Sequence, residues 1–265
     1  MVRLGTFRII LLAAMCKQVK RFTLLLRRFL RAREFGVHFV GTKEFPLPRS
    51  IRWRDRSLFI SAPKEVGLAW DFINLALDDE YGLREFRDKP KTVIDVGANL
   101  GLFSILAAHY FANAMIHAYE PNPRLIPYTA KNLQPVGVTL FNEGVGRVFG
   151  FATIQDKGES RYAHTLLAES ASGNVPIIPL TEAVERMGRE VDLLKLDCEG
   201  AEWDIFQEPR AFEGIRNIRM EYHLIQGHSV RDLERIMTDL GFRIDRWIPN
   251  QGFGIAWLSR NQRSD

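Results

Sequence analysis

Three features of the sequence predict a doubly wound α/β fold, in which a mostly parallel β-sheet carries helices on both faces. From residue 92 onward, β-branched runs alternate with helical patterns, as expected when helices connect parallel strands. A glycine-containing turn, residues 97–101, follows the first of these strands. The composition, with 46% hydrophobic and 26% charged residues, is that of an ordinary globular protein. A chain of 265 residues can hold one large domain with an extension.

The N-terminal 60 residues differ from the rest of the chain in charge. They contain 14 Lys/Arg and 3 Asp/Glu, whereas the remaining residues sum to −7. The first 33 residues have nine basic side chains and no acid, and their longest apolar run, residues 9–16, is too short to span a bilayer. At about 100° per residue, apolar and basic side chains separate onto two faces: Phe22, Leu25, Leu26, Phe29 and Leu30 on one, Lys17, Lys20, Arg27, Arg28 and Arg31 on the other. We therefore expect a basic amphipathic helix within residues 1–40.

Two interpretations of this helix stay open. It can contact an anionic membrane surface peripherally through residues 1–33, or it can pack against its own domain with its basic face in solvent. No specific nucleic-acid partner is expected, because the main domain is mildly acidic. Two cysteines, Cys16 and Cys198, are too few for a disulfide framework. This favours a cytoplasmic location, with the helix at the inner membrane surface under the first interpretation.

Residues 41–89 predict a small N-terminal layer. Within it, residues 49–61 alternate apolar and charged side chains, which is typical of a β-hairpin. Residues 70–86 place apolar side chains at helical spacing. Residues 88–91 then join this layer to a main domain over residues 90–260.

The main domain is expected to alternate strands and helices. Its strands are predicted at residues 92–96, 115–119, 138–141, 191–196 and 215–222, and its helices at residues 102–111, 124–133, 182–187, 201–206 and 230–240. Thr181 is placed to cap the helix over residues 182–187. Extra β segments at residues 145–154 and 175–180 flank a polar loop, and an antiparallel strand pair at residues 242–247 and 253–258 ends the domain.

The turn after the first strand is a candidate cofactor site, because ligands of open α/β sheets bind beyond the carboxyl ends of the strands. Asp95 ends the strand, and Gly97 and Gly101 bracket Ala98 and Asn99. A dinucleotide-binding loop would place a glycine where Asn99 stands, since pyrophosphate needs that close approach. The spacing suits a ligand without pyrophosphate. S-adenosylmethionine, with an amino-acid tail, a ribose and an adenine, is such a ligand.

Polar residues at the ends of the next two strands extend this candidate site. Glu120 ends the second strand about 20 residues beyond the glycine turn, where an acid can accept both ribose hydroxyls, and Asn122 follows it. Asn142 and Glu143 end the third strand, where they can meet the exocyclic amine of adenine. The alternatives are an exposed strand-end acid for Glu120 and a plain turn for the other pair.

Three segments together resemble the FkbM family of S-adenosylmethionine-dependent methyltransferases: VIDVGANLG at residues 93–101, YEPNP at residues 119–123 and LKLDCEGAE at residues 194–202. The family typically has KIDVEGAE in the last segment, and Cys198 replaces its valine. Residues 178–181 and 220–223 also match, so the resemblance covers roughly residues 90–245. It implies a Rossmann-like methyltransferase sheet and, usually, O-methylation of a sugar, a glycan or glycolipid, or a secondary metabolite. The expected partner is therefore a small-molecule or glycan acceptor.

Three candidate catalytic residues lie at the ends of the fourth and fifth strands. His223 is the expected base, because its reference pKa is nearest neutrality. Asp197 can orient the imidazole, grip the acceptor or reach the cofactor, and Glu199 is the third candidate. Glu221 and Glu202 are weaker candidates. The alternatives are a strand-end histidine bonded to a loop, and a turn with a helix cap for the two acids. A divalent cation held by this group is a further alternative, but no metal is expected, since the resemblance does not require one.

Two other functions compete with methyl transfer. A nicotinamide-dependent oxidoreductase could use the same architecture, but Asn99 and the absence of a Tyr-x-x-x-Lys pair disfavour it. A membrane- or RNA-docking module with a vestigial cofactor pocket is suggested by the basic residues 1–60. In the preferred interpretation, residues 155–174 and the N-terminal layer form the wall of the acceptor site.

Overall fold

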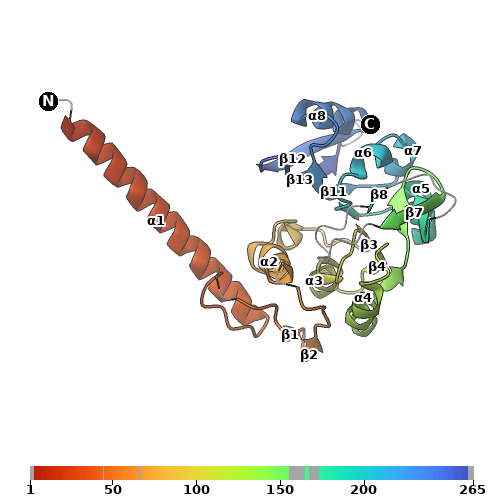
Figure 1. Ribbon diagram of the computed structural model, residues 1–265, viewed down its shortest axis with the longest axis horizontal. Coiled ribbons are helices and arrows are strands. Elements are labelled where there is room, and N and C mark those ends of the chain that lie inside the picture. The colour runs from red at the N-terminus through yellow and green to blue at the C-terminus, as the bar shows by residue number, and fades with distance from the viewer. Residues whose placement is uncertain (1–2, 44, 66, 155–164, 167–172, 262–265) are drawn as a thin grey trace.

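The main sheet has seven strands and is built around β3 (Figure 1). The computed structural model describes residues 3–43, 45–65, 67–154, 165–166 and 173–261. The strand order is β12 (Phe242–Pro249), β13 (Phe253–Arg260), β11 (Asn217–His223), β10 (Leu193–Leu196), β3 (Thr92–Val96), β4 (Met115–Tyr119) and β5 (Thr139–Phe141). β13 runs antiparallel to both of its neighbours, and the other neighbouring pairs are parallel. The predicted α/β fold and the terminal antiparallel pair are confirmed.

Helices cover both faces of this sheet. Successive side chains of its central strands point to opposite faces, and both faces are apolar. On β3, Val93 belongs to one hydrophobic core, whereas Ile94 and Val96 belong to the other. The first core contains residues of α3 (Leu102–Tyr110) and α4 (Ile126–Leu133). The second contains residues of α5 (Leu180–Met187), α6 (Glu202–Ile205), α7 (Pro209–Phe212) and α8 (Val230–Asp239). This arrangement makes the central strands buried on both sides.

The N-terminal layer consists of a hairpin followed by short helices. The hairpin is β1 (Ser50–Trp53) and β2 (Arg56–Phe59), and the helices are α2 (Leu68–Phe72), the π-helix η1 (Ile73–Asp78) and the 3-10 helix η2 (Leu83–Glu85). The predicted hairpin is confirmed. The single helix expected over residues 70–86 is wrong beyond residue 78, because Asp79 and Gly82 adopt left-handed conformations.

This layer shares its core with the main domain. Trp53 and Leu77 are buried in the same hydrophobic cluster as Val93 and Trp257. The indole N–H of Trp53 also donates a hydrogen bond to the carbonyl oxygen of Ile105 in α3, at 3.2 Å. The buried core therefore continues across the expected boundary at residue 89.

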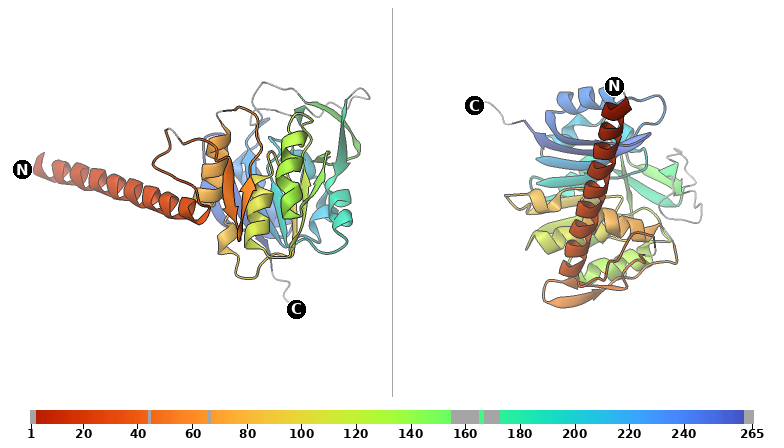
Figure 2. Two further views of the ribbon diagram at one scale, coloured as in Figure 1. Left: turned by 90° about the horizontal axis from the view of Figure 1, so that it is seen from below. Right: turned by 90° about the vertical axis from the view of Figure 1, so that its left-hand side faces the viewer.

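The first helix, α1 (Arg3–Glu34), extends away from the body of the protein (Figures 1 and 2). Its C-terminal part packs against η1, where the Arg28 guanidinium donates to Asp78 Oδ1 at 2.9 Å and Arg31 donates to the carbonyl oxygen of Leu77 at 2.8 Å. Ala32 is buried at this junction. Among the described residues, no helix is long and apolar enough to cross a membrane.

A smaller sheet follows β5 and lies beside the main one. Its order is β6 (Gly144–Gly146), β9 (Val175–Pro179), β7 (Gly150–Ile154) and β8 (Thr165–Leu166), and the 3-10 helix η3 (Gln134–Val136) precedes β5. The extra β segments are thus confirmed. The expected acceptor wall over residues 155–174 lies largely outside the described residues. The predicted Thr181 cap is wrong, since α5 begins at Leu180 after Pro179 and has no side-chain cap.

Candidate active site

A cavity of about 560 Å³ opens at the carboxyl ends of β3, β4, β10 and β11. The chain passes from β3 to β4 on one side and reaches β10 on the other, so the strand order reverses here. One wall comes from the loop after β3 and the end of β4. The opposite wall comes from the ends of β10 and β11, with the N-terminal layer beside it.

The loop after β3 needs glycine at two positions. Gly97 has φ +75° and Gly101 has φ +79°, which side-chain-bearing residues rarely adopt. A Cβ atom on Gly97 would overlap the carbonyl oxygen of Asp197, and one on Gly101 would press against Leu133. The backbone N–H groups of Gly97 and Ala98 both donate to Tyr119 O at 3.0 Å. The loop therefore runs tightly between the ends of β4 and β10, and Gly97, Ala98 and Asn99 line the cavity.

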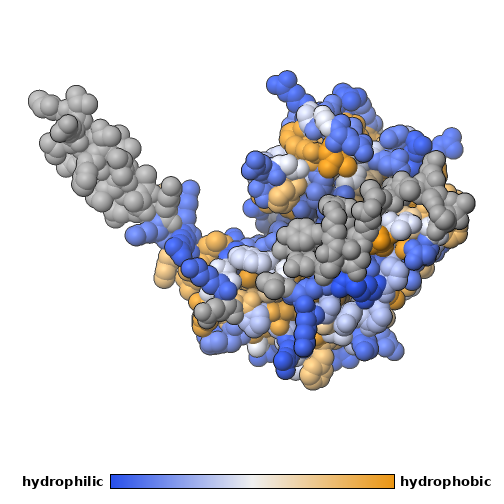
Figure 3. Space-filling model, viewed as in Figure 1, coloured by the Kyte–Doolittle hydropathy of each residue, from blue (hydrophilic) through white to orange (hydrophobic). Residues whose placement is uncertain are grey.

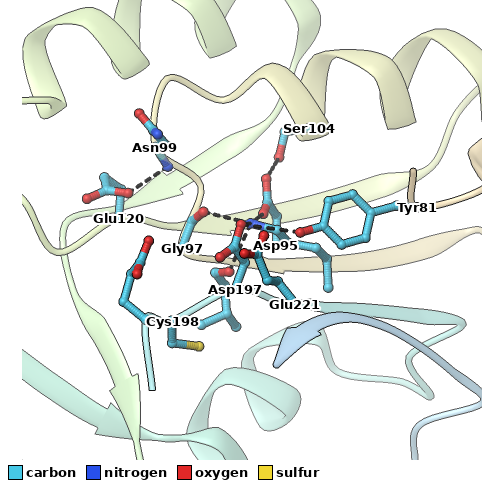
Figure 4. A network of polar contacts seen from close by, with 12 residues as sticks. Tyr81, Asp95, Gly97, Asn99, Ser104, Glu120, Asp197, Cys198 and Glu221 are labelled. Atoms are coloured by element: carbon cyan, nitrogen blue, oxygen red, sulfur yellow. Dashed lines mark hydrogen bonds and ion pairs between the residues drawn. The ribbon is translucent and has the colours of Figure 1, made fainter. Parts of the chain in front are cut away.

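Glu120 holds the same loop from the end of β4. Its Oε2 accepts the Asn99 N–H at 2.6 Å (Figure 4), and its Oε1 accepts the Asn122 N–H at 2.8 Å. The side chain is buried, so the alternative of an exposed strand-end acid is wrong. Burial raises the pKa of Glu120 to about 7, although the two N–H donors act in the opposite direction. Each carboxylate oxygen keeps a lone pair for a ligand hydroxyl.

Unpartnered polar atoms beside Glu120 indicate a polar ligand. In the part of the chain that the structure describes, Asn99 Oδ1 and Asn122 Nδ2 are buried and have no hydrogen-bond partner. Both residues line the cavity. A buried acceptor and a buried donor without partners are costly unless something supplies the missing bonds. A ribose and an adenine carry donors and acceptors of both kinds, so these residues fit S-adenosylmethionine.

Asp95 lies beneath the Gly97 loop and does not line the cavity. It is fully buried, its Oδ2 accepts the Ser104 hydroxyl at 2.7 Å, and its Oδ1 lies 3.3 Å from Lys195 Nζ (Figure 4). The same ammonium group donates to the carbonyl oxygen of Gly97 at 2.7 Å. Lys195 was not among the predicted site residues, although a lysine within the otherwise apolar strand β10 is a signal that could have identified it. Asp95 and Lys195 therefore support the cofactor loop through its backbone.

Asn142 and Glu143 lie elsewhere, which corrects the predicted adenine contact. Neither residue lines the cavity, and Asn142 is exposed. Glu143 forms an ion pair with Arg186 of α5. The chain enters β6 at Gly144 directly after this pair, and Gly144 rather than Glu143 reaches the cavity. The position of a residue at the end of a strand does not by itself show whether Glu143 or Gly144 lines the cavity.

His223 lies among three carboxylates at the end of β11. Its Nε2 is 3.6 Å from both Glu199 Oε2 and Glu221 Oε1, and its Nδ1 is 3.6 Å from Glu202 Oε1. Burial acts to lower the pKa of His223, but Glu202 first, then Glu199 and Glu221, outweigh it and raise that pKa to about 9. The imidazole is therefore protonated at neutral pH. This corrects the premise that His223 stands ready as a base near neutrality.

Glu221 takes part in the same proton equilibrium. It precedes His223 by two positions on β11, so both side chains point to one face of the sheet. Burial, followed by the charge of Asp197, raises the pKa of Glu221 to about 8, and the nearby His223 opposes this shift. Because the side chains of Glu221 and His223 lie 3.6 Å apart, the charge of each residue changes the pKa of the other, and we treat them as one coupled pair. Among the described residues, no group of three His, Cys, Asp or Glu side chains is arranged to hold a metal ion.

Asp197 and Glu199 both line the cavity beside this pair. Asp197 Oδ2 accepts the Tyr81 hydroxyl at 3.3 Å (Figure 4), and Glu199 adopts a left-handed conformation with φ 55°. The alternative that they serve as a helix cap is wrong, since Ala201 precedes α6 and no side chain caps it. Glu202 instead reaches back to accept the Cys198 N–H at 2.8 Å.

Sequence reasoning missed two residues from the N-terminal layer. Glu80 lines the cavity, and burial, followed by the charges of Glu221 and Asp197, raises its pKa well above the usual range. Tyr81 donates to Asp197, as described above. Their position just after a broken helix carries no motif, so long-range packing alone brings them to the site.

Comparison with known proteins identifies the family of the segment that forms most of this cavity. The family model described as the methyltransferase FkbM domain matches residues 95–244, which include the Gly97 loop, Glu120 and His223. The chain belongs to the FkbM methyltransferase family. The resemblance seen in the sequence and the expectation of an S-adenosylmethionine-dependent methyltransferase are thereby confirmed.

Individual relatives of this FkbM protein are distant. It is 26% identical over 212 residues to methyltransferase sdnD of Sordaria araneosa, covering 60% of this chain and 78% of the relative. It is 24% identical over 179 residues to methyltransferase 1 of Beauveria bassiana, covering 58% and 72%. The fold is similar to that of the Methanococcus jannaschii fibrillarin pre-rRNA processing protein, with a TM-score of 0.50 and 12% identity, covering 85% of this chain and 87% of that one.

Proposed function

We propose that this protein binds S-adenosylmethionine in the Gly97 loop and O-methylates a hydroxyl of a sugar, a glycan or glycolipid, or a secondary metabolite. The observation that carries the proposal is the juxtaposition in one cavity of the loop held by Glu120 and the carboxylate group around His223. The first suits an adenosyl ligand. The second offers acceptors for hydroxyl protons.

The donor site would use the loop wall of the cavity. The Glu120 carboxylate would accept the ribose hydroxyls through its free lone pairs, and Asn99 and Asn122 would supply the acceptor and donor that lack partners in the protein. α3 begins at Leu102 without a side-chain cap, so backbone N–H groups of its first turn are available to the donor's carboxylate. When bound, S-adenosylmethionine supplies an electrophilic methyl carbon on a sulfonium.

The acceptor site would use the opposite wall. An alcohol must lose its proton to become a good nucleophile, and a positioned base contributes about 10² to 10⁴ in rate. The coupled pair of His223 and Glu221 would take that proton once it has lost its own, since both pKa values are raised to between about 8 and 9. Asp197, held by Tyr81 and Lys195, would orient the acceptor hydroxyl. Holding the reacting atoms in line would supply much of the acceleration.

Charge supports a neutral or hydroxyl-rich acceptor. Glu80, Asp197, Glu199 and Glu221 line the cavity together with His223. Burial raises the pKa values of Glu80 and Glu221 and favours their neutral forms. Asp197 and Glu199 would oppose a phosphate or carboxylate next to the reacting hydroxyl with like charge, which is unfavourable in a partly buried site. A polyhydroxylated ring can instead donate several hydrogen bonds to these carboxylates.

The test is to incubate the purified protein with S-adenosylmethionine labelled in its methyl group and with fractionated extracts of its source cells. The labelled product is then identified by mass spectrometry and by the alkali stability of its ether. We expect label on an ether oxygen of a neutral acceptor. Label on nitrogen, sulfur or a carboxylate ester would refute O-methylation. Micromolar binding of NADH without binding of S-adenosylhomocysteine would refute the cofactor assignment.

A further inference from the structure

Helix α1 exposes a continuous apolar strip along one side. Val19, Phe22, Leu26, Phe29 and Leu30 have exposed fractions of 62, 68, 45, 38 and 57%. At about 100° per residue these five side chains fall within one third of the helix circumference. We call them the apolar stripe. Its residues lie on one helix, whereas exposed apolar residues elsewhere in a soluble protein are usually scattered.

The body of the protein packs against the opposite side of α1. Arg28 and Arg31 form the hydrogen bonds to η1, and Ala32 and Phe35 are buried at the same junction. The interpretation in which the helix packs on its own domain and leaves only a basic face in solvent therefore fails for this segment. The apolar stripe faces outward, along a helix that extends from the body in the left view of Figure 2.

The charge of the helix favours an anionic partner over a second copy of the chain. Residues 1–33 carry nine basic side chains and no acid. Of the described ones, Lys20, Arg21 and Arg27 are exposed on the two sides of the apolar stripe, and Arg33 is exposed within its arc, over the Phe29 ring. Figure 3 shows hydrophilic residues gathered where α1 meets the body. Two such helices pairing through their stripes would bring like charges together, at a cost in free energy. Anionic lipid would neutralise the same charges.

We propose that α1 docks this methyltransferase on an anionic lipid surface, with the apolar stripe inserted at the headgroup boundary and the flanking basic residues against lipid phosphates. An interfacial helix of this kind needs an apolar face and cationic flanks, and it does not need the length or uniform apolarity of a spanning helix. The helix would hold the body beside the membrane. The cavity, which is built from other segments, would keep its own geometry.

Cosedimentation of the full chain with lipid vesicles tests the proposal. We expect binding to phosphatidylcholine vesicles containing about one third phosphatidylglycerol, and much weaker binding to pure phosphatidylcholine. The triple variant F22S/L26S/L30S should weaken binding by at least about tenfold, because it removes three apolar side chains that the lipid would cover. The double variant K20Q/R21Q should weaken it by about fivefold for each charge removed.

A matched control removes an exposed aromatic residue from another part of the chain. Phe149 is 66% exposed, precedes β7 and lies far from α1 in sequence, so F149S should leave vesicle binding unchanged. Unchanged thermal midpoints would show that all variants fold. Equal losses in F149S and in the triple variant would refute docking through α1, as would binding that survives the triple variant. Failure to bind anionic vesicles, with a dimer in light scattering that the triple variant abolishes, would assign the stripe to self-association instead.

Discussion

Lys195 Nζ lies 3.4 Å from Asp197 Oδ2 at the end of β10. The same ammonium group contacts Asp95 from the neighbouring strand, directly across the parallel register of β3 and β10. These carboxylates raise the pKa of Lys195 even though its burial acts in the opposite direction. One buried cation therefore sets the positions of both the Gly97 loop and Asp197.

Replacing this cation should destabilise the fold. In Lys195→Met, Asp95 keeps its buried charge without its ionic partner, and breaking a buried pair in this way costs about 3 to 5 kcal/mol. Chemical denaturation measured by circular dichroism would report the change. Lys131→Met on the exposed side of α4 is the control and should change the free energy of unfolding by less than about 0.5 kcal/mol. Equal effects of the two substitutions would contradict the role of Lys195.

Glu120→Gln should weaken donor binding. The substitution keeps the shape of the side chain but leaves one acceptor oxygen for the two backbone N–H groups of Asn99 and Asn122 and removes the negative charge that the ribose hydroxyls would contact. We expect a loss of about 1.5 to 3 kcal/mol, or about 10- to 150-fold in Kd. Calorimetric titration with S-adenosylhomocysteine would measure it. The same substitution at Glu143, which does not line the cavity, should leave Kd unchanged. If Glu143→Gln weakened binding as much as Glu120→Gln, Glu143 would contact the adenine as the sequence predicted, and its position outside the cavity would be contradicted.

Gly97→Ala should distort the donor loop more than its backbone conformation alone would predict. The added methyl group meets the carbonyl oxygen of Asp197, and a left-handed φ costs about a further 1 kcal/mol or more. Gly137→Ala has nearly the same φ, +74°, but nothing lies within 4 Å of its added methyl group. The difference in thermal midpoint between the two variants therefore isolates the clash. No difference would mean that the loop can move away from β10 at little cost.

Catalysis should increase with pH between about 7 and 9. The pKa values of His223 and Glu221 are raised to about 9 and about 8, so the coupled pair binds a proton below this window and becomes a base only as the pH rises through it. The measurement is kcat/KM as a function of pH with any identified acceptor. Glu221→Gln should reduce kcat by about 10² to 10⁴ and move the rise to lower pH, because His223 loses one of the charges that raise its pKa, whereas Glu234→Gln on the exposed surface of α8 should do neither. A flat profile in the unsubstituted protein would exclude this pair as the base.

Much of the donor site could be predicted from the sequence because it depends on local rules. The predicted strands at residues 92–96 and 115–119 match β3 and β4 residue for residue, and the glycine turn follows from the space between neighbouring strands. Glu120 was found because parallel strands end at the same edge of a sheet. Glu143 was misplaced because one residue of register decides whether a strand-end side chain faces the cavity.

The acceptor side could not be predicted in the same way, because its properties arise between segments. The pKa of His223 depends on carboxylates from the β10–α6 turn and from β11 together, and reference values omit such neighbours. Glu80 and Tyr81 reach the site because Asp79 ends η1 in a left-handed conformation and Gly82 packs against Trp257. For α1, periodicity identified the apolar face but could not tell which side the body would cover.

The hydrophobic core that crosses residue 89 has a practical consequence for anyone dissecting this enzyme. The segment recognisable by family, residues 95–244, omits Glu80, Tyr81 and the whole of β13, whose Trp257 donates a hydrogen bond to the carbonyl oxygen of Glu80 at 2.7 Å. A fragment limited to that segment would expose apolar side chains on one side of its sheet and would lack Glu80, which lines the cavity. The smallest piece worth expressing has to begin upstream of Phe35 and continue through Arg260.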